Sequence, residues 1–137
     1  MTDHPRRRPA DRRLVETRKV TYIRPDGNAT KIIVSVGYEA ADPTSPVEVF
    51  YSEGFRSGSD LEFTVQDACV LISLLLQHGI SANRITSSMA TRETADADLM
   101  SGEFVALDAT ASMPASMAGA IAAELMIPPS WAEDLPE

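Results

Sequence analysis

The sequence is poor in cysteine, histidine and aromatic residues. Its one cysteine, Cys69, has no partner for a disulfide within the chain, and Cys69 with the two histidines lacks the spacing of a metal site. The longest apolar stretch, residues 68–76, is interrupted by Ser73 and is far shorter than the roughly 20 residues that span a bilayer. We therefore predict a protein without a metal, a cofactor or a membrane span.

The N-terminus lacks the apolar core of a signal peptide, because arginines and prolines dominate residues 5–13. We therefore expect the chain to reside in the cytoplasm. With 137 residues, of which 44% are hydrophobic and 23% charged, its composition is typical of one soluble globular domain. A chain of this length buries roughly two thirds of its unfolded surface, so it needs no disulfide or metal for stability.

Basic residues are scarce after residue 31. Up to that residue the chain has 9 Lys and Arg against 4 acidic residues, and after it 3 against 16. Such asymmetry is typical of a basic arm on an acidic domain, and an arm of this kind can contact nucleic acid, an acidic partner or its own domain. We expect residues 1–13 to be a disordered arm, residues 14–127 one domain and residues 128–137 an acidic tail. Contacts to nucleic acid would come from the arm: Arg6, Arg7, Arg8, Arg12 and Arg13.

Three β-strands are predicted in the first half of the domain. Residues 14–24 carry several β-branched and aromatic residues and end at Pro25-Asp26-Gly27-Asn28, a strong turn signal. The return strand, residues 30–38, places Ile32, Val34 and Val36 on one face, which is expected to enter the core. Residues 40–46 contain two prolines and should connect to a third strand, residues 47–52.

The longest predicted element is a central helix that ends at residue 78. Ser59-Asp60-Leu61-Glu62 has the spacing of a capping box with Ser59 as the N-cap, and Gly79 is typical of a left-handed residue after a helix. Residues 68–76 are apolar almost all round. Most of the circumference of this helix should therefore be covered.

Two shorter helices are predicted after the central one. Ser81 caps the first, which runs to about residue 89, and Pro114 suits the first turn of the second, which runs to about residue 126. In the second helix Met117, Ile121 and Leu125 recur every four residues, and we expect this stripe in the core rather than on a partner surface.

The remaining segments are less regular. Residues 91–103 are polar and predicted to form a loop, and residues 104–107 are compatible with a short strand or an ordered return. Pro128-Pro129 ends the last helix, and Trp131 gives the tail one aromatic anchor. The predicted fold is α+β, with a three-stranded antiparallel sheet packed against a long central helix and two shorter helices.

The glycine-rich turn at residues 54–59 is a candidate anion site, because backbone N–H groups at a helix N-terminus and the side chains of Arg56 and Ser57 could gather around an anion. Against this interpretation, Asp60 and Glu62 already interact with the positive end of the helix dipole and would repel a second negative charge. The turn also lacks the lysine of a phosphate-binding loop. A simple loop with a helix cap is the favoured interpretation.

A polar line runs along the central helix through Gln66, Ser73 and Gln77. It is either the solvent edge of the helix or the lining of a shallow groove, and we favour the solvent edge. His78 lies in the last turn, where an imidazolium would interact well with the helix dipole. Cys69, between apolar neighbours, is expected to be an inert buried thiol. We therefore predict no catalytic residue.

Several of these residues resemble the TSCPD domain, which occurs at the C-terminus of cobalamin-dependent ribonucleotide reductases and in short free-standing bacterial and phage proteins. The resemblance rests on Glu48-Val49-Phe50, Gly54, Gly58-Ser59, the run Ile-Ser-Leu-Leu-Leu-Gln-His-Gly-Ile at residues 72–80, and Ile85. It covers roughly residues 12–89. Residues 114–116 with Gly119 resemble the closing segment of the short relatives.

The Thr-Ser-Cys-Pro-Asp signature of the family is absent from this chain, together with any cysteine pair. The parent reductases use a thiyl radical and a cysteine pair as reductant, so a chain with one cysteine is not a complete reductase. The resemblance therefore implies an association with deoxynucleotide synthesis and not the parent activity.

Our first hypothesis is a non-catalytic accessory or interaction module that binds a ribonucleotide reductase subunit. The alternatives are a nucleic-acid-associated protein that binds through its arm, and a nucleotide-binding module that uses the turn at residues 54–59. A homodimer is also expected to be compatible with the fold, because three strands leave two sheet edges. The predicted binding surface gathers the polar residues of the family-like segment: Arg56, Ser57, Gly58, Ser59, Asp60, Gln66, Asp67, Ser73, Gln77 and His78.

Overall fold

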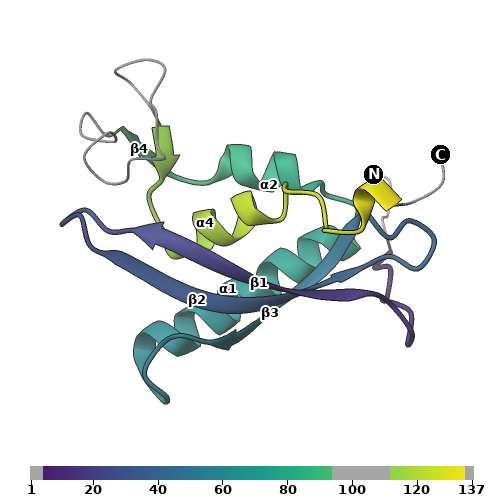
Figure 1. Cartoon of the computed structure of the whole chain (residues 1–137), viewed down its shortest axis with the longest axis horizontal. Coiled ribbons are helices and arrows are strands. Elements are labelled where there is room, and N and C mark those ends of the chain that lie inside the picture. Colours follow the sequence, from purple (N-terminus) through teal and green to yellow (C-terminus); the bar gives the residue numbers. More distant parts are fainter. Residues whose placement is uncertain (1–4, 94–111, 135–137) are drawn as a thin grey trace.

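The computed structural model of the chain describes residues 5–93 and 112–134 (Figure 1). These residues form one three-stranded antiparallel sheet in the order β1-β2-β3, a two-stranded ribbon and three α-helices, so the predicted α+β class is confirmed. In Figure 1, α1 runs behind the strands, and α2 and α4 lie together above them. The bounds are β1 Val15–Ile23, β2 Ala29–Tyr38, β3 Pro46–Glu53, α1 Asp60–Gln77, α2 Ala82–Ser88, β4 Thr91–Glu93, β5 Ser112–Pro114, α4 Met117–Glu124 and the 3-10 helix η1 Ala132–Asp134.

The sheet follows the predicted alternation. Ile32, Val34 and Val36 of β2 are at most 1% exposed and face the core, whereas the residues between them lie on the other face. The turn from β1 to β2 is closed where the N–H of Gly27, at φ +90°, donates to the carbonyl of Arg24 at 2.8 Å. This register puts Thr17 and Lys19 of β1 on the same face as Lys31 and Ser35 of β2, whereas Glu16 and Arg18 lie on the opposite face.

Both ends of α1 are set by local signals that the sequence contains. The Ser59 hydroxyl accepts a hydrogen bond from the backbone N–H of Glu62 at 3.2 Å, and the Glu62 carboxylate accepts one from the N–H of Gly58 at 2.9 Å. After the helix, Gly79 has φ +87°, a conformation that only glycine adopts without strain. The predicted cap and the predicted C-terminal glycine are therefore confirmed.

The last helix closes the core. Met117, Ile121 and Leu125 are at most 8% exposed, so the four-residue stripe packs inside the domain as predicted. The predicted start at Pro114 is wrong, because Pro114 ends strand β5 and α4 begins at Met117. The Ser116 hydroxyl, which accepts a hydrogen bond from the N–H of Gly119 at 3.1 Å, is the actual N-cap.

The segment after α2 differs in part from the prediction. Thr91–Glu93 forms strand β4, paired with β5, where the sequence predicted a loop. The rest of that loop and residues 104–107 lie outside the described residues. In the C-terminal segment, Trp131 packs edge-on against the Tyr38 ring at 5.2 Å between centroids and donates to the carbonyl of Pro43 at 2.7 Å, so the aromatic anchor is confirmed.

Candidate functional site

Helix α1 lies along the outer edge of β3 and hydrogen-bonds the backbone of that strand. The Ser73 hydroxyl accepts from the N–H of Val49 at 2.9 Å and donates to the carbonyl of the same residue at 3.1 Å. The Gln77 amide donates to the carbonyl of Val47 at 3.2 Å. The predicted solvent edge is therefore wrong for Ser73 and Gln77, which are only 8% and 3% exposed.

The spacing of these contacts explains why a helix can close a strand edge. One turn before Ser73, the Cys69 thiol is hydrogen-bonded by the backbone of Tyr51, two residues beyond Val49. Four residues of a helix advance about 6 Å and two residues of a strand about 6.6 Å, so side chains at every fourth helical position meet every second strand residue. The polar line of α1 therefore satisfies backbone groups that would otherwise be an open edge.

A groove of about 480 Å³ runs between this edge and the outer side of α1. We call it the β3–α1 groove. Its walls are mainly apolar, with Phe50 on the strand side and Val70 and Leu74 on the helix side. Its lining residues are Arg6, Pro9, Arg13, Glu48, Val49, Phe50, Tyr51, Gln66, Cys69, Val70, Ser73, Leu74 and Gln77.

The basic arm closes one end of the groove. The backbone N–H of Arg7 donates to the carbonyl of Gln77 at 2.7 Å, and the Arg6 guanidinium donates to the Gln77 side chain. Arg13 forms an ion pair with Glu48. A basic arm can contact nucleic acid, an acidic partner or its own domain, and in this structure the arm contacts its own domain. The predicted disorder of residues 1–13 stays a prediction.

Glu48 is 3% exposed, and its side chain lies over β2 at Gly37. A β-carbon at position 37 would lie 2.7 Å from Cγ of Glu48, closer than such atoms approach in proteins. Because Gly37 has no side chain, the Glu48 side chain can occupy the space above it. Arg13 supplies the positive charge that a buried carboxylate needs.

Around the groove, α1 exposes large apolar side chains. Val70 and Leu71 are 56% and 62% exposed, and Phe50 on the neighbouring strand is 52% exposed. Phe63 and Leu75 are also exposed on this helix. The prediction that most of the circumference of α1 is covered is therefore wrong within the described residues. The apolar run in the sequence supplies two surfaces, one for the core and one for the outside.

The predicted binding residues are divided between the two ends of α1. Gln66, Ser73 and Gln77 line the groove, Asp67 is exposed elsewhere on α1, and His78 is exposed at the C-cap of this helix. The other five predicted residues lie at the N-terminal end of α1: Arg56, Ser57, Gly58, Ser59 and Asp60. The 18 residues of this helix span about 27 Å, which separates these five from Gln77 at the other end. At that end the Ser59 hydroxyl accepts a hydrogen bond from the N–H of Glu62, and the Gly58 N–H donates to the Glu62 carboxylate, so both groups already have a partner within the chain.

The sequence did not single out the apolar groove walls or the arm contacts. The sequence pattern assigns Phe50 to a strand and Val70 and Leu74 to a helix, but it does not tell which half-buried side chain borders a hollow. Alternation in β3 did place Phe50 and Glu48 on the same face. This alternation is the one signal in the sequence that could have brought them together.

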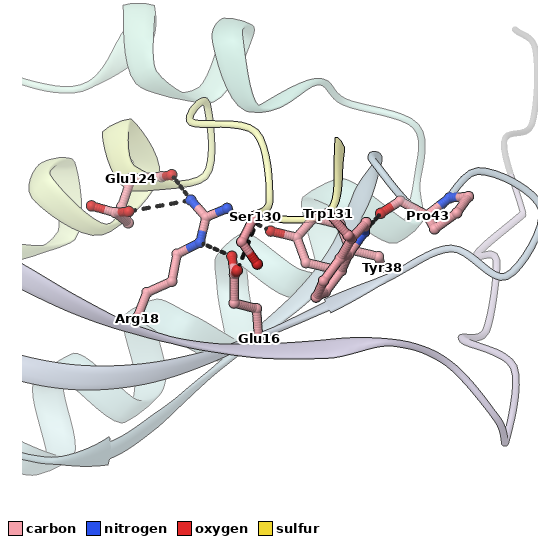
Figure 2. A network of polar contacts seen from close by, with 7 residues as sticks. All are labelled: Glu16, Arg18, Tyr38, Pro43, Glu124, Ser130 and Trp131. Carbon is pink, nitrogen blue, oxygen red and sulfur yellow. Dashed lines mark hydrogen bonds and ion pairs between the residues drawn. The ribbon is translucent and has the colours of Figure 1, made fainter. Parts of the chain in front are cut away.

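A polar network on the opposite side of the molecule ties the C-terminal segment to the sheet (Figure 2). The buried Arg18 guanidinium donates to the Glu16 carboxylate at 2.7 Å, to the backbone carbonyl of Glu124 at 2.8 Å and to the Tyr38 hydroxyl at 2.9 Å. Glu16 also accepts from the N–H of Ser130 at 3.0 Å. The contacts drawn in Figure 2 join β1 to α4 and hold the C-terminal segment to β1, to Tyr38 of β2 and to Pro43.

Two carboxylates around Arg18 have opposite pKa shifts. Burial raises the pKa of Glu16, but hydrogen bonds from Ser130 and Arg18 outweigh it, so the pKa lies below its ordinary value. For Glu124, burial raises the pKa and the single 3.2 Å contact with Arg18 does not offset it. The network is therefore held mainly through Glu16.

The Cys69 thiol is 2% exposed, and burial raises its pKa to about 11, although the hydrogen bond from Tyr51 opposes the shift. A thiol with a raised pKa is a poor nucleophile at neutral pH, as predicted for an inert cysteine. Across residues 5–93 and 112–134, the structure has no group of three or more His, Cys, Asp and Glu side chains placed to hold a metal ion.

Comparison with known proteins gives one result. The model of the TSCPD domain family matches residues 5–125, and no curated protein and no solved structure gives a significant match. Among the described residues, no helix is long and apolar enough to cross a membrane. The match begins within the basic arm and ends within α4's C-terminal cap, so it covers the sheet, α1 and both walls of the β3–α1 groove. The chain therefore belongs to the TSCPD domain family.

Proposed function

We propose that this chain is a non-catalytic interaction module linked to ribonucleotide reductase, which acts in the cytoplasm and binds a reductase subunit through the β3–α1 groove. The observation that carries the proposal is the half-exposed apolar rim of the groove, formed by Phe50 and Val70. Contiguous exposed apolar side chains beside a hollow are typical of protein interaction sites. Membership in the TSCPD family supports the choice of a reductase as the partner.

The chemistry of the groove favours binding over catalysis. Several of its polar groups are engaged within the chain, since Ser73 and Gln77 bond the strand edge and Arg13 pairs with Glu48. The Cys69 thiol in its wall has a pKa raised to about 11 by burial. A partner therefore finds apolar side chains to pack against, and Arg6 at one end as a charged contact.

The test is affinity purification of the tagged full-length chain from the producing cell, with reductase subunits identified by mass spectrometry. The wild-type chain should recover a reductase subunit, and Val70→Glu should lose it, because a charge on the rim opposes apolar packing. Val15→Glu is the matched control, since Val15 is 51% exposed on β1 and lies outside the groove lining. Failure of the wild-type chain to recover any reductase subunit would contradict the proposal.

The nucleotide-binding alternative has less support. The turn at residues 54–59 would have to receive a phosphate beside Asp60 and Glu62, and the Gly58 N–H already donates to Glu62. Thermal unfolding with nucleotides tests it directly, because a ligand at 100 times its dissociation constant adds about 2.7 kcal/mol to the unfolding free energy.

A further inference from the structure

One face of the three-stranded sheet carries exposed side chains on all three strands. Thr17 of β1 pairs with Ser35 of β2, and Ser35 pairs with Phe50 of β3, so these three side chains form a row across the sheet. Thr17 and Phe50 are exposed and Ser35 is partly exposed. The valines of β2 lie on the opposite face, where they form the core together with buried residues of α1 and α4. We call this surface the open face.

Short side chains lie beside Phe50 on the open face. Its neighbour across the strands is Ser35, and the next residue on that side of β2 toward the arm is Gly37. The hydroxyl of Ser52, two residues along β3, lies 3.3 Å from that of Ser35. The Phe50 ring is 52% exposed. A half-exposed aromatic ring on a β-sheet, bordered by small residues, is a platform on which a nucleic-acid base can stack.

Positive charges lie on both sides of this ring along the strands. Lys19 and Lys31 are exposed on the open face toward the β1–β2 turn. In the other direction the arm adjoins the sheet where Arg13 pairs with Glu48. From Lys31 to Gly37 the strand covers about 20 Å, which is long enough for several phosphates of a single strand.

The distribution of acidic residues leaves this face favourable to a polyanion. The charge of Glu48 is balanced by Arg13, and Glu53 lies at the end of β3. Glu16 of β1 lies on the opposite face, Asp26 lies in the β1–β2 turn, and Asp60, Asp67 and Glu124 lie on the helices. Lys19 and Lys31 thus lie on the open face, and Arg13 lies beside it, whereas Arg18 is buried on the opposite face.

We propose that the open face binds single-stranded nucleic acid, with a base stacked on Phe50 and phosphates bound by Lys19, Lys31 and the exposed arm residues Arg8 and Arg12. This site shares Phe50 with the β3–α1 groove and differs from it at Lys19 and Lys31, which do not line the groove. Phe50 lies where the two surfaces meet.

The experiment is fluorescence anisotropy of a labelled oligothymidylate of about 15 nucleotides, titrated with the full-length chain at about 50 mM salt. The wild-type chain should bind in the micromolar range, with an affinity that falls steeply as salt is raised. Lys19→Glu with Lys31→Glu should weaken binding more than about tenfold, because two phosphate contacts become repulsive. Phe50→Leu should weaken it about tenfold through lost stacking.

Two control variants distinguish binding at the open face from an effect of net charge and from binding at the β3–α1 groove. Arg84→Glu changes the net charge by as much as Lys31→Glu alone does but lies on α2, outside the sheet, so it should bind nearly as well as the wild type while Lys31→Glu weakens binding. Val70→Glu should keep nucleic-acid binding while losing the reductase partner, so the two proposals fail independently. Circular dichroism and thermal unfolding establish that each variant is folded.

Three outcomes would overturn the proposal. The first is no anisotropy change at protein concentrations up to about 100 μM in low salt, the weak limit of non-specific binding. The second is an equal loss of binding in Arg84→Glu and in Lys31→Glu, which would reduce the effect to net charge. The third is loss of binding on Arg8→Glu with Arg12→Glu while the lysine and Phe50 variants bind as the wild type does, which would assign the contact to the arm alone.

Discussion

Ser73 on α1 hydrogen-bonds both backbone groups of Val49 on β3, at 2.9 Å to the N–H and 3.1 Å to the carbonyl. One hydroxyl thereby replaces the strand that would otherwise pair with this edge of the sheet. Because Gln77 also bonds the edge, at the carbonyl of Val47, the helix is fixed along the strand and not only packed on it. The groove exists because α1 is held at this position.

Replacing Ser73 by alanine removes the partner of two buried backbone groups. An unsatisfied buried group costs about 1–3 kcal/mol, so Ser73→Ala should lower the free energy of unfolding by about that amount or more. Urea denaturation followed by circular dichroism measures the change. Ser57→Ala, on an exposed loop, is the control and should change stability little. An unchanged unfolding midpoint for Ser73→Ala would contradict the role assigned to this contact.

The elements of this fold could be predicted because their signals are local. Alternation in residues 30–38, the cap at Ser59 and the glycine after α1 each depend on neighbours within a few residues. The position of α4 was missed by three residues because Pro114 and Ser116 are both plausible helix starts. Only the pairing of β4 with β5, a contact between distant segments, shows that Pro114 belongs to a strand.

Glu16 should make stability depend on pH. Its pKa in the folded protein lies below the ordinary value of 4.5, so the stabilisation is present above that pH and is lost as pH falls through the folded value. Glu16→Gln should therefore lower the free energy of unfolding at pH 7, by about 1–3 kcal/mol. The difference between wild type and variant should shrink below pH 4.5, as measured by denaturation at several pH values.

Glu124 is the matched comparison within the same network. Burial raises its pKa, so its charged form is disfavoured in the folded protein and the cost is present above the ordinary pKa. Glu124→Gln should thus lower stability at pH 7 less than Glu16→Gln does, as measured by the same denaturation series. A larger loss of stability for Glu124→Gln than for Glu16→Gln would show that Arg18 is held mainly through Glu124.

Cys69 should resist alkylation in the native protein. Burial raises its pKa from 9.0 to about 11, so roughly a hundredfold less thiolate is present at a given pH below both values. Iodoacetamide at pH 8 should label the native chain far more slowly than the chain in urea, as followed by mass spectrometry. Equal labelling rates in the two states would contradict the burial of this thiol and the position of α1.

The groove was harder to predict than the fold, since it depends on which faces of α1 meet the sheet. The apolar run at residues 68–76 predicts burial all round, but the sheet presents one edge to α1, so Val70 and Leu71 face outward. Likewise, Ser73 and Gln77 look like solvent-facing positions until the edge of β3 supplies their partners. Polarity in a helix does not say whether water or a strand edge satisfies it.

Gly37 and Glu48 should behave as a coupled pair. In Gly37→Ala the new β-carbon would lie 2.7 Å from Cγ of Glu48, so the buried carboxylate and its ion pair with Arg13 must shift. Overpacking of this kind costs about 1–3 kcal/mol. In the background of Glu48→Ala the space is open, so the same substitution should cost less, with a coupling energy above about 0.5 kcal/mol in a double-mutant cycle. Gly27→Ala is the control, because Gly27 has φ +90° and no atom within 4 Å of the added carbon. Gly27→Ala costs backbone strain alone, so its cost should be the same with and without Glu48→Ala. If the cost of Gly37→Ala were also the same in both backgrounds, Gly37 would be required for its backbone and not for the space that it leaves to Glu48.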